Sequence, residues 1–159
     1  MNEHGNQVKT IVAAIASQED QRRLKKALGF PEWKVRVVQN LRGLSTAMTT
    51  GFCCVVITDT RLPDGSWKDI LNSLDRLWNR PQLIVADRLA SEALWAEVLN
   101  LGAYDLLAMP FDLTEIQRVV SRAWEFSIGE IARARNRALR ETLITRDSSA
   151  AVRGFAASA

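Results

Sequence analysis

A single carboxylate follows the most apolar stretch of the chain. The run FCCVVIT, residues 52–58, leads directly into Asp59, and a Pro-Asp-Gly turn follows at residues 63–65. A continuous apolar run of this kind is typical of a parallel strand that is buried on both faces. A carboxylate that ends such a buried strand usually has a chemical role. Asp also ends strands as a turn former, so both interpretations of Asp59 stay open.

Other residue types that carry chemistry are scarce. His4 is the only histidine, so His-based catalysis and a protein zinc site are not expected. Cys53 and Cys54 are adjacent and are the only cysteines, so no disulfide framework is predicted. We interpret them as buried, small hydrophobic residues in a reducing cytoplasm. No GxGxxG, Walker or GxSxG motif occurs, and we therefore expect no enzyme activity.

Composition indicates one compact domain with a modest extension. The 159 residues are 47% hydrophobic, which is ample for a core. A formal net charge of +3 does not describe a polycation that coats nucleic acid. The sequence also predicts neither a signal peptide nor a stretch long enough to span a bilayer, so we expect a cytoplasmic protein.

Short apolar runs alternate with helical patterns along the chain. The helical segments differ from the strands in carrying apolar residues at a period of about 3.6. Either Asp112 or Thr114 could cap the last helix. The expected strands are 10–16, 34–38, 52–58, 81–86 and 105–108, and the expected helices are 18–28, 41–50, 67–79, 91–101 and one that begins near residue 112.

Strict alternation of this kind predicts an α/β fold with a parallel sheet and helices on both faces. Right-handed crossovers leave few topologies, and we expect the flavodoxin-like strand order 2-1-3-4-5 with an extended last helix. In such sheets, functional groups gather at the carboxyl ends of the strands near the point where strand order reverses. Asp59 is predicted to lie at that edge.

Two segments carry a resemblance to a known family. The stretch VVITDTRLPDG around Asp59 and the stretch GAYDLLAMPFD at residues 102–112 resemble the receiver domain of bacterial two-component response regulators, and the likeness extends over residues 8–126. The resemblance implies a CheY-like fold. It also places Asp59 at the position of the family's phosphoacceptor aspartate. The resemblance therefore implies a role in signal transduction through a phosphorelay.

The rest of the family's site does not match. Receivers carry two acids after the first strand that hold Mg²⁺ together with the phosphoacceptor, and these positions correspond to Ala16 and Ser17; the nearby Glu19 and Asp20 are expected to serve the helix N-terminus. By the same resemblance, further family positions have lost their chemistry: the hydroxyl after the fourth strand is Ala86, the aromatic residue of the fifth strand is Leu106, and the lysine before the proline is Met109. We therefore expect a degenerate receiver, or pseudo-receiver, with no cofactor and with Mg²⁺ binding lost or weak.

The last third of the chain forms a second feature. Residues 127–145, rich in Ala, Arg, Leu and Glu, predict a helical extension, and residues 146–159 predict a flexible tail. Ile128 and Ile131 begin a short, weak coiled-coil seam and are candidate contacts of a homodimer. Three arginines share another face, which is either solvated or contacts phosphate groups: Arg133, Arg137 and Arg140.

Three functional hypotheses follow. The leading one is a non-enzymatic signalling module that binds a protein partner, either a histidine kinase or a downstream signalling protein, and pairs with itself. The second is a single-domain response regulator that still accepts phosphate on Asp59. The third, less favoured, is a nucleic-acid-associated regulator that acts through the arginine-rich helix; no membrane partner is expected.

Overall fold

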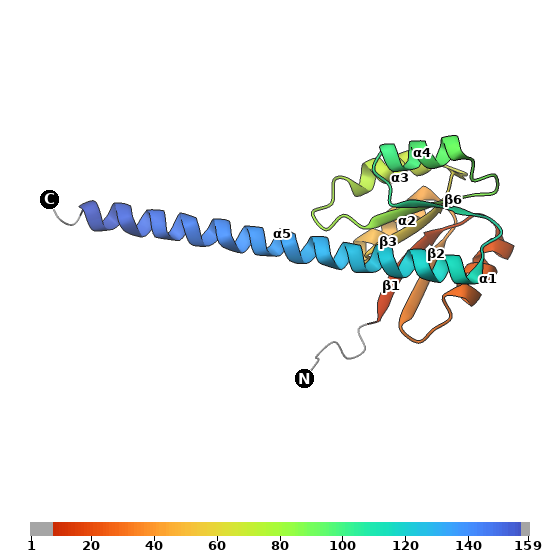
Figure 1. The fold of residues 1–159 in the computed structure, drawn as a ribbon, viewed down its shortest axis with the longest axis horizontal. Coiled ribbons are helices and arrows are strands. Elements are labelled where there is room, and N and C mark those ends of the chain that lie inside the picture. Colours follow the sequence, from red (N-terminus) through yellow and green to blue (C-terminus); the bar gives the residue numbers. More distant parts are fainter. Residues whose placement is uncertain (1–7, 157–159) are drawn as a thin grey trace. The chain divides into compact units, whose positions relative to one another are not determined.

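A five-stranded parallel sheet forms the centre of the fold. The computed structural model describes residues 8–156 and places the strands in the order β2-β1-β3-β6-β7 (Figure 1). This order confirms the predicted topology. The sheet strands are β1 (Lys9–Ala14), β2 (Trp33–Val38), β3 (Val55–Asp59), β6 (Gln82–Asp87) and β7 (Asp105–Ala108).

Helices cover both faces of the sheet, as the alternating pattern predicts (Figure 1). On one face, Gln117 Nε2 of the last helix donates a hydrogen bond to the Ala27 carbonyl of the first helix at 2.8 Å. On the other face, one apolar cluster joins alternate strand residues to buried side chains of the three middle helices, including Leu44, Ile70 and Val98. The helices are α1 (Gln18–Ala27), α2 (Leu41–Thr49), α3 (Trp67–Leu74), α4 (Glu92–Asn100) and α5 (Leu113–Ala156).

The Pro-Asp-Gly turn builds more structure than the sequence predicts. It closes a small antiparallel hairpin of β4 (Arg61–Leu62) and β5 (Gly65–Ser66). Asp64 at its tip accepts hydrogen bonds from the backbone N–H groups of Leu41 at 2.7 Å and Arg42 at 3.0 Å. These two N–H groups belong to the first turn of α2, where helix donors lack intrahelical partners. The turn after Asp59 therefore also fixes the start of a helix.

The third helix is shorter than predicted. The spacing predicts a helix over 67–79, but α3 ends at Leu74, and Leu77 and Trp78 are exposed rather than packed. Pro81 disfavours helical backbone at the residue before it. In addition, Arg80 Nη2 donates to the Gly102 carbonyl at 2.7 Å, which fixes this connection outside the helix.

The chain divides into two compact units, residues 1–127 and 128–159. Helix α5 starts where Asp112 Oδ1 accepts a hydrogen bond from the Glu115 N–H at 2.8 Å, so Asp112 rather than Thr114 caps it. The sequence predicts a flexible tail over residues 146–159, but residues 146–156 are helical, and residues 157–159 lie outside the described part of the chain. No proline interrupts this segment, and Ala, Ser and Arg tolerate helix. None of the helices within residues 8–156 is both long and apolar enough to cross a membrane.

Candidate functional site

Asp59 is the last residue of β3 and lies at the carboxyl edge of the sheet. It sits opposite Ala86 in the register between β3 and β6, and its side chain is half-buried. Its Oδ2 atom accepts a hydrogen bond from the backbone N–H of Ala16 at 2.9 Å, whereas its buried Oδ1 atom has no hydrogen-bond partner among the described residues. One oxygen of the carboxylate is therefore held, and the other is uncommitted.

Burial raises the pKa of Asp59 above its ordinary value. Desolvation is the largest cause, and the Ala16 N–H opposes it by stabilising the charged form. Nearby charges act in both directions: the carboxylates of Asp20 and Asp87 raise the pKa, and the guanidinium of Arg88 lowers it. The site therefore contains three carboxylates with an arginine beside them.

Asp20 is part of this site, which the sequence analysis did not predict. Although Asp20 lies in the first turn of α1, it is only 3% exposed, and its Oδ2 atom accepts a hydrogen bond from Arg88 Nη2 at 2.6 Å. The interpretation that it only serves the helix N-terminus is incomplete. Glu19, its neighbour, instead pairs with Arg23 on the exposed side of the helix.

Asp87 and Thr60 complete the polar edge. Asp87 Oδ2 accepts a hydrogen bond from Thr60 Oγ1 at 2.9 Å, and its Oδ1 atom accepts from the N–H groups of Leu89 at 2.9 Å and Ala90 at 3.1 Å. These bonds lower the pKa of Asp87 despite a desolvation cost that acts the other way. The pair Asp87-Arg88 follows an apolar strand, as Asp59 does, so the positional argument used for Asp59 could have found it.

Comparisons with known proteins agree with this geometry. The receiver domain of a putative LuxO repressor from Vibrio parahaemolyticus superposes with a TM-score of 0.73 at 18% identity, covering 79% of this chain and 97% of that one. The receiver domain of an HD domain-containing protein from Pseudomonas fluorescens Pf-5 gives 0.71 at 19% identity, covering 79% and 93%. The chain has the receiver fold of response regulators. No protein-family model matches the sequence.

Two curated relatives are similar in sequence as well. The DNA-binding transcriptional regulators NtrC of Rhizobium meliloti (strain 1021) and of Bradyrhizobium sp. (strain RP501 Parasponia) are each 32% identical to this chain over 102 residues. The match covers 63% of this chain and 21% of each relative. The chain therefore spans about a fifth of the length of these relatives.

The structure describes all five positions at which the resemblance to receivers predicts lost chemistry. Ala16 reaches Asp59 through its backbone, and Ser17 Oγ accepts a hydrogen bond from the Asp20 N–H at 3.3 Å as the cap of α1. Ala86 and Leu106 are buried apolar side chains. Met109 follows β7, and its backbone N–H donates to the Asp87 carbonyl at 3.0 Å. None of these five side chains offers a carboxylate or a positive charge to Asp59.

The donors at this edge do not suit Mg²⁺. The ion prefers octahedral oxygen ligands, usually with more than one carboxylate free to bind. Here Asp20 is paired with Arg88, and both Asp87 oxygens are occupied by protein donors. Within residues 8–156, no group of three or more His, Cys, Asp or Glu side chains is arranged to hold a metal ion.

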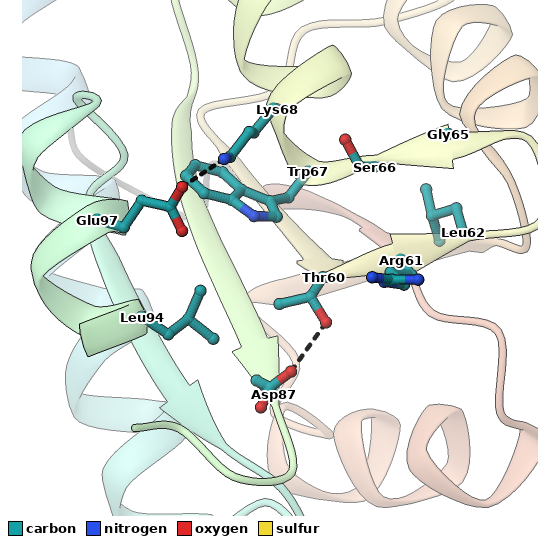
Figure 2. A pocket seen from close by; sticks show the side chains of 10 residues that line it. All are labelled: Thr60, Arg61, Leu62, Gly65, Ser66, Trp67, Lys68, Asp87, Leu94 and Glu97. Carbon is teal, nitrogen blue, oxygen red and sulfur yellow. Dashed lines mark hydrogen bonds and ion pairs between the residues drawn. The ribbon is translucent and has the colours of Figure 1, made fainter. Parts of the chain in front are cut away.

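A cavity of about 640 Å³ lies beside the polar edge (Figure 2). Trp67 forms part of its wall, Lys68 pairs with Glu97 of α4, and the Thr60–Asp87 hydrogen bond lies at its other side. Lys68 Nζ also lies 5.7 Å from the centroid of the Trp67 ring. Trp67 lines this cavity together with Thr60 and Asp87, so tryptophan fluorescence, to which Trp67 contributes as one of five tryptophans, can report events beside the polar edge.

The second unit carries the other predicted contacts. Ile128 and Ile131 are half-buried, and the large apolar side chains Leu139, Leu143 and Ile144 are exposed at 56%, 61% and 66%. Arg133 pairs with Glu130 along the helix. The three arginines predicted to share a face, Arg133, Arg137 and Arg140, are all exposed.

The two cysteines are free and buried, as predicted. They precede β3 rather than lying within it, because the strand begins at Val55. Cys53 Sγ donates a hydrogen bond to the Val55 carbonyl at 2.9 Å. Burial raises the pKa of Cys53 to about 11 and also raises that of Cys54. Both thiols therefore stay protonated and unreactive near neutral pH.

Proposed function

We propose that this chain is a degenerate signal-transduction receiver that acts through protein–protein contacts rather than through Mg²⁺-dependent phosphorylation of Asp59. The observation that carries the proposal is the set of groups around Asp59. By the resemblance, Ala16 and Ser17 stand where receivers have acids. The Ala16 N–H binds Asp59, the Ser17 hydroxyl caps α1, and the neighbouring carboxylate Asp20 is engaged by Arg88.

Phosphoryl transfer to a carboxylate depends on positioning and on neutralising the charge of the transferred group. With Met109 and Ala86 in place of a lysine and a hydroxyl, an incoming phosphoryl group lacks two of its partners. Losing one such electrostatic partner costs on the order of 3 kcal/mol in the transition state.

The partner in this proposal is another protein. We expect a histidine kinase or a downstream signalling protein in the cytoplasm, with no catalytic turnover by the chain itself. The buried, free cysteines are compatible with a reducing compartment. Self-association is part of the same proposal: the second unit exposes several large apolar side chains along one helix, and Ile128 and Ile131 are its expected contacts in a two-fold dimer.

One observation favours the second hypothesis, a phosphorylatable regulator. The buried Oδ1 atom of Asp59 has no hydrogen-bond partner within the described chain, so no protein donor competes with a phosphoryl group for this oxygen. The nucleic-acid hypothesis has weaker support. The curated relatives are named as DNA-binding regulators, but this chain spans only 21% of them, and residues 128–156 combine six arginines with three acids.

Beryllofluoride, a phosphate mimic, separates these hypotheses. We expect no change in Trp67 fluorescence or in the ¹H–¹⁵N NMR spectrum of the full chain when beryllofluoride and millimolar Mg²⁺ are added together. The matched control is Asp59→Ala, which should be indistinguishable from the wild type. Saturable shifts that need both ions and disappear in Asp59→Ala would instead establish a working phosphoacceptor site.

A further inference from the structure

An ion pair joins two distant parts of the chain at the Asp59 edge. Arg88 lies in the loop after β6, and Asp20 lies in the first turn of α1, 68 residues earlier. Arg88 Nη2 lies 2.6 Å from Asp20 Oδ2, and the two side chains are 60% and 4% exposed. The pair therefore fixes a surface arginine onto a buried carboxylate.

A buried carboxylate is costly unless a positive charge or several donors satisfy it. The neighbouring acids have other partners: the Ala16 N–H for Asp59, and the Thr60 hydroxyl with two backbone N–H groups for Asp87. Asp20 depends on the guanidinium. The charge of Arg88 also acts favourably on Asp59, which both other acids disfavour. One side chain thus serves two of the three carboxylates.

We propose that Arg88 is the built-in counter-ion of this site. Its guanidinium holds Asp20 and offsets the negative charge of the edge, which is the task of the bound divalent cation in receivers with an intact acid pair. The loop after β6 is thereby tied to α1 without a metal. This inference rests on the proposed function, because it explains how the edge is stable when Mg²⁺ is not used.

Arginine suits this task better than lysine. The guanidinium stays charged at all relevant pH values and presents five donors in a planar fork, so one face can bind Asp20 while other N–H groups remain for solvent or Asp59. The opposing interpretation is an ordinary surface ion pair, which would contribute little to stability. The 4% exposure of the Asp20 side chain is what separates the two interpretations.

A double-mutant cycle in the full chain tests the pairing. Arg88→Ala, Asp20→Asn and the double variant are compared by urea unfolding at pH 7. Because removing one partner leaves a buried charge, we expect Arg88→Ala to lower the folding equilibrium constant by about tenfold to a hundredfold. Asp20→Asn should recover part of that loss when added to Arg88→Ala, giving a coupling of about tenfold. Additive effects would overturn the proposal.

The matched control is Arg23→Ala, which removes an exposed pair with Glu19 from the same helix. The side chains of Arg23 and Glu19 are 47% and 73% exposed, so we expect Arg23→Ala to change the folding equilibrium constant by less than about threefold. An equal effect of Arg23→Ala and Arg88→Ala would show that Arg88 has no special role. Arg88→Lys keeps the positive charge and should retain most of the stability.

A second measurement tests the counter-ion role rather than the structural tie. Removing Arg88 leaves the carboxylate edge without its internal cation, so Tb³⁺ added to Arg88→Ala should bind at least about tenfold more tightly than to the wild type. Tryptophan-sensitised luminescence reports this binding, and Arg88→Lys, which keeps the positive charge, should bind Tb³⁺ more weakly than Arg88→Ala. Equal Tb³⁺ affinity in wild type and Arg88→Ala would overturn the counter-ion role. The two proposals fail separately: beryllofluoride binding by the wild type contradicts the proposed function and leaves the Arg88–Asp20 coupling untouched.

Discussion

The backbone N–H of Ala16 donates a hydrogen bond to Oδ2 of Asp59 at 2.9 Å. The resemblance to receivers predicts an acid at position 16, and in this chain the main chain of Ala16 instead holds the carboxylate at the end of β3. The Ala16 side chain itself is exposed. The position can therefore accept a larger polar side chain without disturbing the core, and the missing acid can be put back.

Restoring the acid pair should create weak Mg²⁺ binding. The variant Ala16→Asp, Ser17→Asp adds two carboxylates beside Asp59, and aspartate can replace Ser17 as the cap of α1. We expect calorimetry and Trp67 fluorescence to detect millimolar binding in the variant and a flat titration in the wild type. Phosphoryl transfer should remain poor, because Met109 still supplies no positive charge.

Asp59→Ala in the restored background is the control for that experiment and should abolish the new binding. The opposite finding, a saturable Mg²⁺ signal in the wild type that Asp59→Ala removes, would show that the native donors suffice for the ion.

Self-association should require the second unit. A single exposed helix of this kind buries little apolar surface on its own, and isolated helices gain most of their stability from packing. Sedimentation velocity should therefore show a dimer for the full chain and a monomer for a chain that ends at Ser127. Ile131→Glu in the full chain should also dissociate the dimer, because it places a charge at the expected contact. Monomers for every version at tens of micromolar would remove the dimer from the proposal.

Cys53 should make the protein less stable at alkaline pH. Burial raises the pKa of its thiol from 9.0 to about 11, so the unfolded chain releases this proton at a lower pH than the folded chain does. The contribution is fully present below pH 9 and is lost between pH 9 and 11. By linkage, the loss over that window is about 2 to 3 kcal/mol. Urea unfolding of the wild type and Cys53→Ala across this range measures it.

Cys54 is present in both proteins and controls for other thiol effects. The free energy of unfolding of the wild type should fall more steeply with pH than that of Cys53→Ala. Parallel curves would contradict the burial of an uncharged thiol at this position.

Asp64, which lies in the turn between β4 and β5, should stabilise the start of α2. Its carboxylate accepts the N–H groups of Leu41 and Arg42, and the Leu41 hydrogen bond is the largest cause of its lowered pKa. Because the folded pKa lies below the unfolded one, this stabilisation is present near neutral pH and is lost as pH falls through the folded pKa. Asp64→Ala should lower the urea midpoint at pH 7, and the difference from wild type should shrink in acid. A difference that persists unchanged at pH 2 would point to another cause.

The sequence by itself determined the layers of the fold and the place of Asp59. The apolar run before Asp59 predicts a buried parallel strand because burial on both faces requires continuous hydrophobic residues. The alternation of elements then limits the sheet to very few strand orders. The expectation of lost chemistry at Ala16, Ser17 and Met109 came from the resemblance to receivers, and it stays a prediction.

Local patterns did not determine where elements stop. Periodicity continues through Leu77 and Trp78, but α3 ends at Leu74 because Pro81 and the Arg80–Gly102 hydrogen bond fix the following segment. At the other end of the chain, residues 146–156 are helical although their small and polar composition suggested a tail. Helix ends depend on competition between neighbouring interactions, which a hydrophobic period does not record.

Only the tertiary structure decided which charges meet at the edge of the sheet. The sequence pattern predicts Asp20 only as an acid at a helix start and gives no role to Arg88. The parallel crossovers bring the two loops together at one carboxyl edge, where a 2.6 Å contact buries the Asp20 carboxylate. Asp64 reaches α2 in the same way, across 23 residues. Such contacts depend on side-chain reach between elements that are distant in sequence, so a pattern of neighbouring residues cannot specify them.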